Sequence, residues 1–123
     1  MLEIEFEKAV VDLAHMFGWK VASFRPAQTG KGWRTPVKYD GKGYPDLTLV
    51  HHDCVIFAEL KAAKGTMSDE QETWRSHLEE VEWNTTKSAI QDTPPVRYFC
   101  WKPKDAKQIA DVLSFGRVTN WTL

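Results

Sequence analysis

Residues 43–50 read GYPDLTLV and residues 55–61 read VIFAELK, with only His51 to Cys54 between them. Both stretches are rich in aliphatic, β-branched or aromatic residues and are bounded by polar ones, which is typical of buried or half-buried strands. A linker of four residues is short enough for a hairpin loop. We therefore predict two antiparallel strands in which Val50 faces Val55.

The predicted register sorts the side chains of this hairpin onto two faces. Side chains alternate between the faces of a sheet along each strand. One face is therefore expected to carry the apolar residues Leu47, Leu49, Ile56, Ala58 and Leu60. The other face is expected to carry Asp46, Glu59 and Lys61, with Asp46 directly opposite Glu59.

Two carboxylates at opposed positions repel each other unless a cation or a shared proton lies between them. Lys61 is one such cation, but a divalent metal is the stronger explanation. Oxygen ligands suit hard ions such as Mg²⁺ or Mn²⁺, which bind through one or two carboxylates together with waters and phosphate. A lysine beside such a site can orient water or offset charge on a phosphate. The alternative is that these residues are simply the solvated ends of two strands.

The same residues carry a family resemblance. Pro45-Asp46 followed by Glu59-Leu60-Lys61 resembles the core motif of the PD-(D/E)XK nuclease superfamily. A longer pattern resembles the VRR-NUC (virus-type replication-repair nuclease) family, in particular its short stand-alone phage members. That pattern comprises Gly43–Leu47, Ala58–Lys61, Lys64-Gly65, Ser68, Gln71 and Trp74. The similarity extends over almost the whole chain.

This resemblance implies a restriction-endonuclease-like α/β core, in which helices flank a mixed β-sheet in the order α-β-β-β-α-β-α. It implies an endonuclease that hydrolyses DNA with Mg²⁺ or Mn²⁺, held by Asp46, Glu59 and the backbone carbonyl of Leu60. Lys61 would act on the attacking water or the phosphate, and Gln71 would line the active site. Stand-alone members of this family imply a homodimer acting on branched DNA such as Holliday junctions, although flap cleavage by a monomer stays open.

The first helix is expected to supply one more acidic residue to the site. Phe6, Val10, Leu13, Ala14 and Phe17 form an apolar stripe at helical spacing between Glu3 and Phe17. Glu3 and Glu7 are four residues apart and lie on one flank of this stripe. Nucleases of the resembled superfamily place an acid here, and either residue qualifies. Glu7 departs from the family pattern, which tends to have Gln at this position, and Ser23 stands where a His is frequent.

The segment that precedes the hairpin is locally basic. Net charge is −1 over 123 residues, yet this segment has one acid, Asp40, against Arg25, Lys31, Arg34, Lys38 and Lys42. We predict a long loop over Ala27–Gly43 whose basic side chains contact DNA phosphates. A merely soluble loop is the alternative.

The rest of the chain predicts ordinary supporting elements. We expect a strand over Trp19–Arg25, a helix capped by Ser68 that runs to about Glu82 with Trp74, Leu78 and Val81 inward, and a polar loop over Asn84–Pro95. A strand over Val96–Trp101 and a short helix follow. The tail, Gly116–Leu123, is compatible with either an edge strand or a partner-facing segment.

Length and composition indicate one domain over residues 1–123. No stretch suggests a membrane span or a signal peptide, and Cys54 and Cys100 are isolated, so they are expected to be reduced thiols of a cytoplasmic protein, in the host cytoplasm if phage-encoded. Two functions compete: a metal-dependent deoxyribonuclease, which the intact Asp46, Glu59 and Lys61 favour, and a nucleic-acid-binding module that keeps the fold without catalysis.

Overall fold

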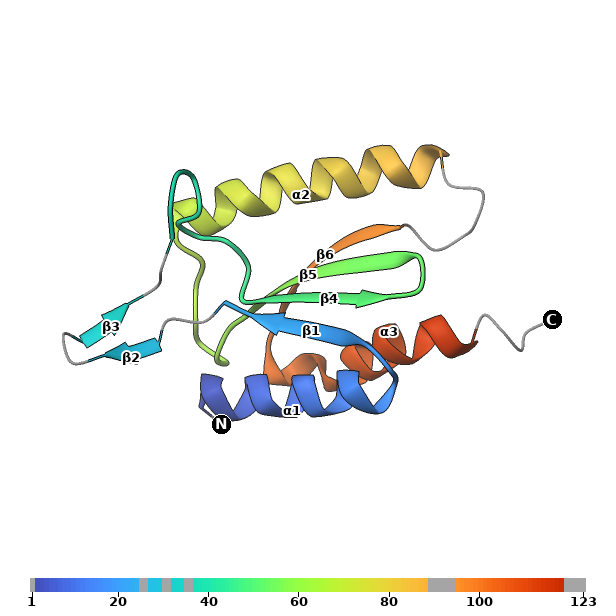
Figure 1. The fold of residues 1–123 in the computed structure, drawn as a ribbon, viewed down its shortest axis with the longest axis horizontal. Helices are drawn as coiled ribbons and strands as arrows, with labels where there is room; N and C mark the ends of the chain where they lie inside the picture. The colour runs from blue at the N-terminus through green and yellow to red at the C-terminus, as the bar shows by residue number, and fades with distance from the viewer. Residues whose placement is uncertain (1, 25–26, 30–31, 35–36, 89–94, 119–123) are drawn as a thin grey trace.

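The computed structural model describes residues 2–24, 27–29, 32–34, 37–88 and 95–118 (Figure 1). At 27–29, 32–34, 88 and 115–118 the backbone alone is described. In chain order the elements are α1 (Glu3–Met16), β1 (Lys20–Ser23), β2 (Ala27–Thr29), β3 (Gly32–Arg34), β4 (Leu47–His51), β5 (Cys54–Leu60), α2 (Asp69–Ser88), β6 (Val96–Trp101), the 3-10 turn η1 (Pro103–Asp105) and α3 (Ala106–Val118).

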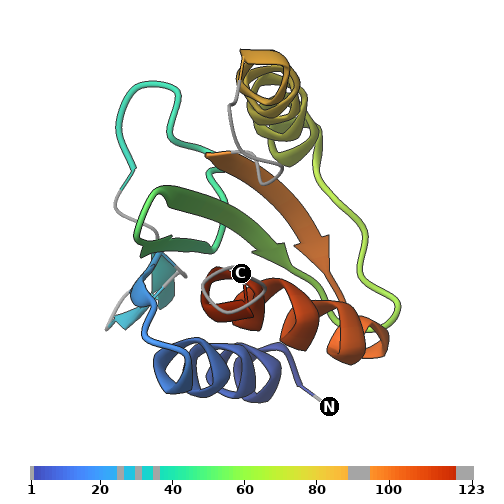
Figure 2. The ribbon, with the colours of Figure 1, turned by 90° about the vertical axis from the view of Figure 1, so that its right-hand side faces the viewer.

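Four of the strands form a mixed sheet in the order β1-β4-β5-β6. β1 and β5 each pair antiparallel with β4, whereas β6 runs parallel to β5. α1 and α3 cover one face of this sheet and α2 lies over the other, as two perpendicular views show (Figure 1 and Figure 2). The predicted α/β architecture is therefore confirmed at the level of a mixed sheet flanked by helices.

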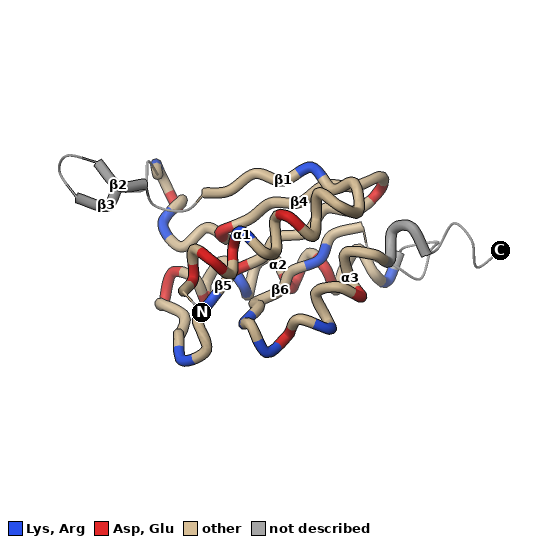
Figure 3. Tube along the Cα trace, turned by 90° about the horizontal axis from the view of Figure 1, so that it is seen from below, with Lys and Arg blue, Asp and Glu red and all other residues tan. Residues whose placement is uncertain are grey.

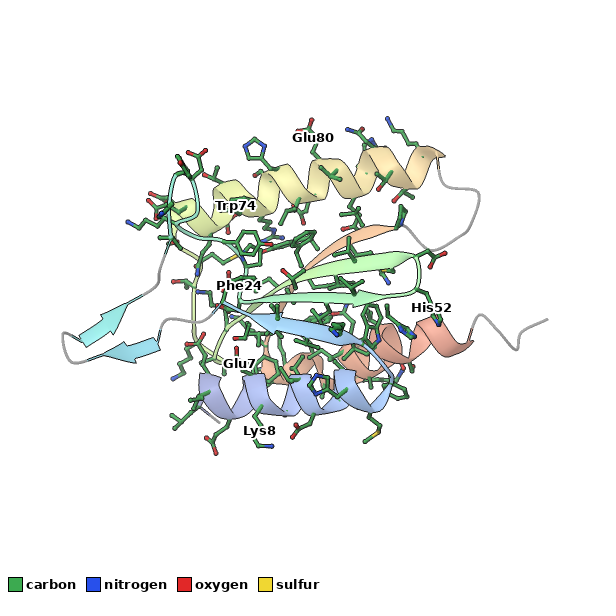
Figure 4. The ribbon with its side chains drawn as sticks, viewed as in Figure 1. Glu7, Lys8, Phe24, His52, Trp74 and Glu80 are labelled. Atoms are coloured by element: carbon green, nitrogen blue, oxygen red, sulfur yellow. The ribbon has the colours of Figure 1, made fainter. Side chains whose placement is uncertain are left out.

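The register of the central hairpin is the predicted one. Val50 pairs with Val55, Leu49 with Ile56 and Leu47 with Ala58. The predicted four-residue loop is wrong, because His51 and Cys54 still pair and leave a two-residue turn. His52 lies at the tip of this turn with a φ of 53° (Figure 4). Two-residue hairpin turns favour such left-handed residues because they match the twist of the strands.

The apolar face of the hairpin forms the centre of the core. Leu47, Leu49 and Ile56 are fully buried, and they pack with residues from both helices of that layer, namely Phe6, Val10 and Ala14 of α1 and Ile109 and Leu113 of α3. Trp19 is also buried, and its indole N–H donates a hydrogen bond of 2.7 Å to the carbonyl of Leu113. The predicted separation of an apolar face from a charged face therefore holds.

The predicted boundaries need several corrections. The strand over Trp19–Arg25 is shorter, and the loop over Ala27–Gly43 contains the small β2–β3 hairpin. α2 continues past Glu82 to Ser88, so the first five residues of the predicted loop are helical, and residues 89–94 lie outside the described residues. This extension is anchored because Glu82 accepts a hydrogen bond of 2.9 Å from the backbone N–H of Tyr98 in β6.

Two further predictions concern the ends of helices. Val81 is 42% exposed rather than inward, because α2 turns that side of its second half away from the sheet. α3 extends to Val118, which makes the beginning of the predicted tail helical, while residues 119–123 lie outside the described residues. Gly18, with a φ of 88°, follows the end of α1 as predicted.

A close approach at Gly43 fixes the segment before β4 against the first turn of α2. Gly43 has a φ of 85°, a conformation that side chains disfavour. A Cβ atom built there would lie 2.5 Å from the carbonyl carbon of Glu70 and 2.7 Å from the backbone nitrogen of Gln71. Only glycine lets the two backbones come this close.

We expect Gly43→Ala to lower the free energy of unfolding by about 2 kcal/mol or more, since it adds backbone strain to a steric clash. Gly65→Ala is the matched control, because a Cβ there meets its nearest neighbours at 3.3 Å and φ is not positive. Urea unfolding followed by circular dichroism measures both. Equal loss of stability in the two variants would contradict the proposed contact.

Candidate active site

Asp46 and Glu59 come together where β4 begins and β5 ends. The backbone N–H of Leu60 donates a hydrogen bond of 2.9 Å to Oδ2 of Asp46, which holds this carboxylate beside the end of β5. Glu59 is only 1% exposed, and its carboxyl group hydrogen-bonds with that of Asp46. The structure therefore brings together the two carboxylates that the register predicts.

The first turn of α2 joins Lys61 to this pair. Lys61 Nζ donates a hydrogen bond of 2.8 Å to Oε1 of Gln71, and Nε2 of Gln71 donates one of 3.3 Å to Oε1 of Glu59. Gln71 also takes part in the predicted capping box. Its Oε1 accepts from the backbone N–H of Ser68 at 2.9 Å, and its own backbone N–H donates to Ser68 Oγ at 3.2 Å. One amide side chain thus caps the helix and links the cation to the carboxylate.

Burial changes the acidity of Glu59. Desolvation, the hydrogen bond with Asp46 and the negative charge of Asp46 together raise the pKa of Glu59 from 4.5 to about 9. The charge of Lys61 acts in the opposite direction, and Glu3 adds a smaller upward effect. Without a bound cation, the pKa of Glu59 therefore lies above neutral pH.

The two candidate acids of α1 have different surroundings. Glu3 is near enough to Glu59 to raise its pKa. Glu7 instead accepts a hydrogen bond of 2.7 Å from Ser23 Oγ, and it lies on the side of α1 that faces β1, whereas Lys8 points away (Figure 4). Acidic positions gather where the start of α1 meets the end of β5 (Figure 3). Which of Glu3 and Glu7 serves the site stays a prediction.

The donor atoms of the site fit a hard divalent cation. Among the described residues, no group of three or more His, Cys, Asp and Glu side chains gathers to hold a metal. The pair of Asp46 and Glu59 is nevertheless a sufficient protein contribution for Mg²⁺ or Mn²⁺, which retain several waters. A cation between the two would also relieve the repulsion that raises the pKa of Glu59. The backbone carbonyl of Leu60 as a further ligand stays a prediction.

The predicted DNA-binding residues divide into two groups. Arg25 and Lys31 lie outside the described residues, and of Arg34 only the backbone is described, within β3. Lys38 is exposed, and Lys42 is exposed with Nζ 3.9 Å from a carboxylate oxygen of Glu70. The described basic residues are thus available to solvent, but their contact with DNA stays a prediction.

An open groove of about 550 Å³ beside the first turns of α2 was not predicted. It lies between the segment before β4 and α2, and its lining consists of Asp40, Lys42, Glu70, Thr73, Trp74 and His77. Trp74, predicted to be a core residue, is half-buried here, and its indole N–H donates to the carbonyl of Asp40 at 3.0 Å. The sequence indicates one wall of this groove, because the four lining residues of α2 have the i, i+3, i+4, i+7 spacing of a single helix face. The opposite wall is the segment before β4, which packs against α2 at Gly43. The spacing of residues along the sequence does not predict this contact.

Comparison with known proteins adds no family assignment. No protein-family model matches the chain, and no curated protein is significantly similar to it in sequence. None of the described helices combines the length and apolar character needed to cross a membrane.

The raised pKa of Glu59 predicts how the stability of the metal-free protein depends on pH. A pKa that is higher in the folded state stabilises the fold fully below the unfolded value, near 4.5, and this contribution is lost as pH rises toward the folded value, near 9. Between these limits the free energy of unfolding is expected to fall by at most about 1.4 kcal/mol per pH unit. Glu59→Gln, which cannot ionise, should be more stable than the wild type at pH 8 but not at pH 4.5.

Urea unfolding in EDTA across this pH range measures the effect. Glu80→Gln is the control, since Glu80 is an exposed acid of α2 that points away from the sheet (Figure 4). It should leave the pH profile unchanged. An unaltered profile for Glu59→Gln would show that Glu59 is not the buried, protonated group.

Proposed function

We propose that the protein is a metal-dependent endonuclease that hydrolyses phosphodiester bonds in DNA, built on a restriction-endonuclease-like core of the VRR-NUC type. The observation that carries this proposal is the buried carboxyl of Glu59, hydrogen-bonded to Asp46 and linked through Gln71 to the ammonium group of Lys61. Burying the carboxyl of Glu59 beside a second acid costs stability, and such groups are frequent at functional sites. Phosphoryl chemistry with Mg²⁺ or Mn²⁺ is such a function.

Asp46 and Glu59 would hold the divalent ion, with the carbonyl of Leu60 as a further ligand. When bound, the ion lowers the pKa of a water and neutralises charge on the scissile phosphate. The chain prepares this site in two ways. The N–H of Leu60 orients the carboxylate of Asp46, and the amide of Gln71 orients that of Glu59. Glu3, from α1, would bind an outer water or position a second ion.

Lys61 supplies the positive charge that the reaction needs next to the phosphate. Its Nζ is held by the carbonyl oxygen of Gln71, an acceptor that leaves two of the three ammonium protons for other partners. These protons can orient the attacking water or stabilise charge that develops on the phosphate oxygens. The Gln71 amide, fixed by the helix cap, sets the position of this lysine relative to Glu59.

The substrate and the assembly follow from the same family resemblance. We propose branched DNA, such as a Holliday junction or a flap, cleaved by a homodimer in the cytoplasm. Arg25, Lys31, Arg34, Lys38 and Lys42 are the proposed contacts to the phosphate backbone. A panel of junction, flap and linear duplex, combined with sedimentation analysis, tests this part.

Asp46→Ala and Lys61→Ala are each expected to lower the rate of DNA cleavage at least a hundredfold, because the first removes a ligand of the divalent ion and the second a positive charge next to the phosphate. Both should keep the wild-type circular dichroism spectrum. Lys107→Ala is the control for Lys61→Ala, since Lys107 is an exposed lysine of α3 paired with Asp111. Wild-type rates for both site variants with junction, flap and linear DNA would refute the assignment.

Mg²⁺ or Mn²⁺ is expected to raise the melting temperature by several degrees, corresponding to about 2.7 kcal/mol at one hundred times Kd. The effect should grow between pH 6 and pH 9, because the ion must displace the proton of Glu59, and Glu59→Gln should abolish it. Differential scanning calorimetry measures the shift. A melting temperature that does not respond to either metal would favour the non-catalytic DNA-binding module.

A further inference from the structure

Phe24 lies directly beside the carboxylate pair. β1 pairs with β4 so that Ser23 lies opposite Leu47. The backbone N–H of Phe24 continues this pairing with a hydrogen bond of 2.7 Å to the carbonyl of Asp46. Opposed residues share a face, with Cβ atoms about 5 Å apart. Phe24, Asp46 and Glu59 therefore form a row across three strands on the face that carries the candidate site.

The ring of Phe24 is exposed although it is large and apolar. Its exposed fraction is 49%, and it projects near the edge of the sheet (Figure 4). Tyr44 supports it by an edge-to-face contact, with ring centroids 5.2 Å apart at 80°. Tyr44 is in turn held against Trp74 at 5.0 Å and Phe57 at 6.2 Å. The ring is thus supported from within the protein while much of its surface meets solvent.

The location of this ring suits a nucleobase. A base is joined to its phosphate through one sugar, so a base that flanks a phosphate held at Asp46 and Glu59 lies within reach of a neighbouring side chain. Bases in an intact duplex have both faces covered by their neighbours, whereas an unpaired base can stack on an aromatic side chain. An aromatic side chain exposed at such a place can therefore stack on an unpaired base but not on a base inside an intact duplex.

We infer that Phe24 stacks on an unpaired base beside the scissile phosphate and makes the site selective for DNA whose bases are unstacked at the cleavage point. This inference rests on the proposed nuclease function and defines its substrate class. Phe24 is a positioning residue, since it places the phosphate and takes no part in the hydrolysis. It contributes no charge or proton to the carboxylate pair.

The test compares a fully paired duplex with a matched duplex that has a short unpaired segment at its centre, with Mg²⁺. Phe24→Ala should lower kcat/KM for the unpaired substrate roughly tenfold to a hundredfold and change the paired substrate little. Phe24→Leu keeps the apolar contact with Tyr44 but lacks an aromatic face, so it should show the same loss even if the alanine variant folds poorly. Phe24→Trp should retain the selectivity.

Trp83→Ala is the matched control. Trp83 is another exposed aromatic, at 63%, in the second half of α2. Its removal should leave both rates unchanged. Equal losses on paired and unpaired DNA in Phe24→Leu, or no loss at all, would overturn the inference. A loss of sedimenting mass in Phe24→Leu with unchanged selectivity would also overturn it, because the ring would then face a second copy of the chain.

A binding measurement separates this inference from the proposed function. The unpaired segment carries 2-aminopurine, whose fluorescence is quenched on stacking, and Ca²⁺ replaces Mg²⁺ so that a cation still holds the phosphate at the carboxylates while cleavage is suppressed. Quenching by the wild type and Phe24→Trp but not by Phe24→Leu supports the inference, even if no DNA is cleaved when Mg²⁺ is added. Cleavage without differential quenching supports the nuclease and overturns the stacking.

Discussion

The register of the β4–β5 hairpin is the constraint on which the rest of the structure depends. Side chains alternate along a strand, so a slip of one residue would turn Leu49 and Ile56 to the outside and move Glu59 into the apolar core. Burial of the apolar face of the hairpin against α1 and α3 therefore determines that Glu59 lies opposite Asp46. Burial of apolar side chains is not directional, but here it selects one strand register and thereby determines which polar residues are opposite each other.

Burial of Glu59 beside Asp46 costs part of the stability that the apolar face of the hairpin provides. Glu59 is almost completely buried, and its pKa is raised because water is excluded and Asp46 is close. Gln71 and the N–H of Leu60 satisfy part of the hydrogen-bonding capacity of the two carboxyl groups, but they bring no positive charge. Lys61 brings one, and it is held by Gln71 rather than placed between the acids. A divalent cation bound between Asp46 and Glu59 would supply the positive charge that this pair lacks.

The sequence predicts the parts of this protein that depend on local periodicity and fails where tertiary contacts decide. The hairpin register, α1 and β6 follow from patterns of apolar residues, and the meeting of Asp46 with Glu59 follows from the register. The different surroundings of Glu3 and Glu7 do not, because both lie on one flank of α1 and only tertiary packing brings Ser23 to Glu7 and Glu3 toward Glu59. The extra length of α2 depends on Glu82 reaching β6, a contact between residues far apart in the sequence.

The surroundings of the carboxylates are built from three strands and one helix turn that meet at one level of the sheet. Gly43 lets the segment before β4 lie against Glu70 and Gln71, so this segment packs directly on the helix cap. Tyr44, the next residue, supports Phe24 on one side and meets Trp74 on the other. A displacement of this segment would therefore change the position of the Phe24 ring beside Asp46 and of the Gln71 amide that holds Lys61. The ring of Phe24 and the hydrogen bonds of Gln71 thus depend on the same backbone contact.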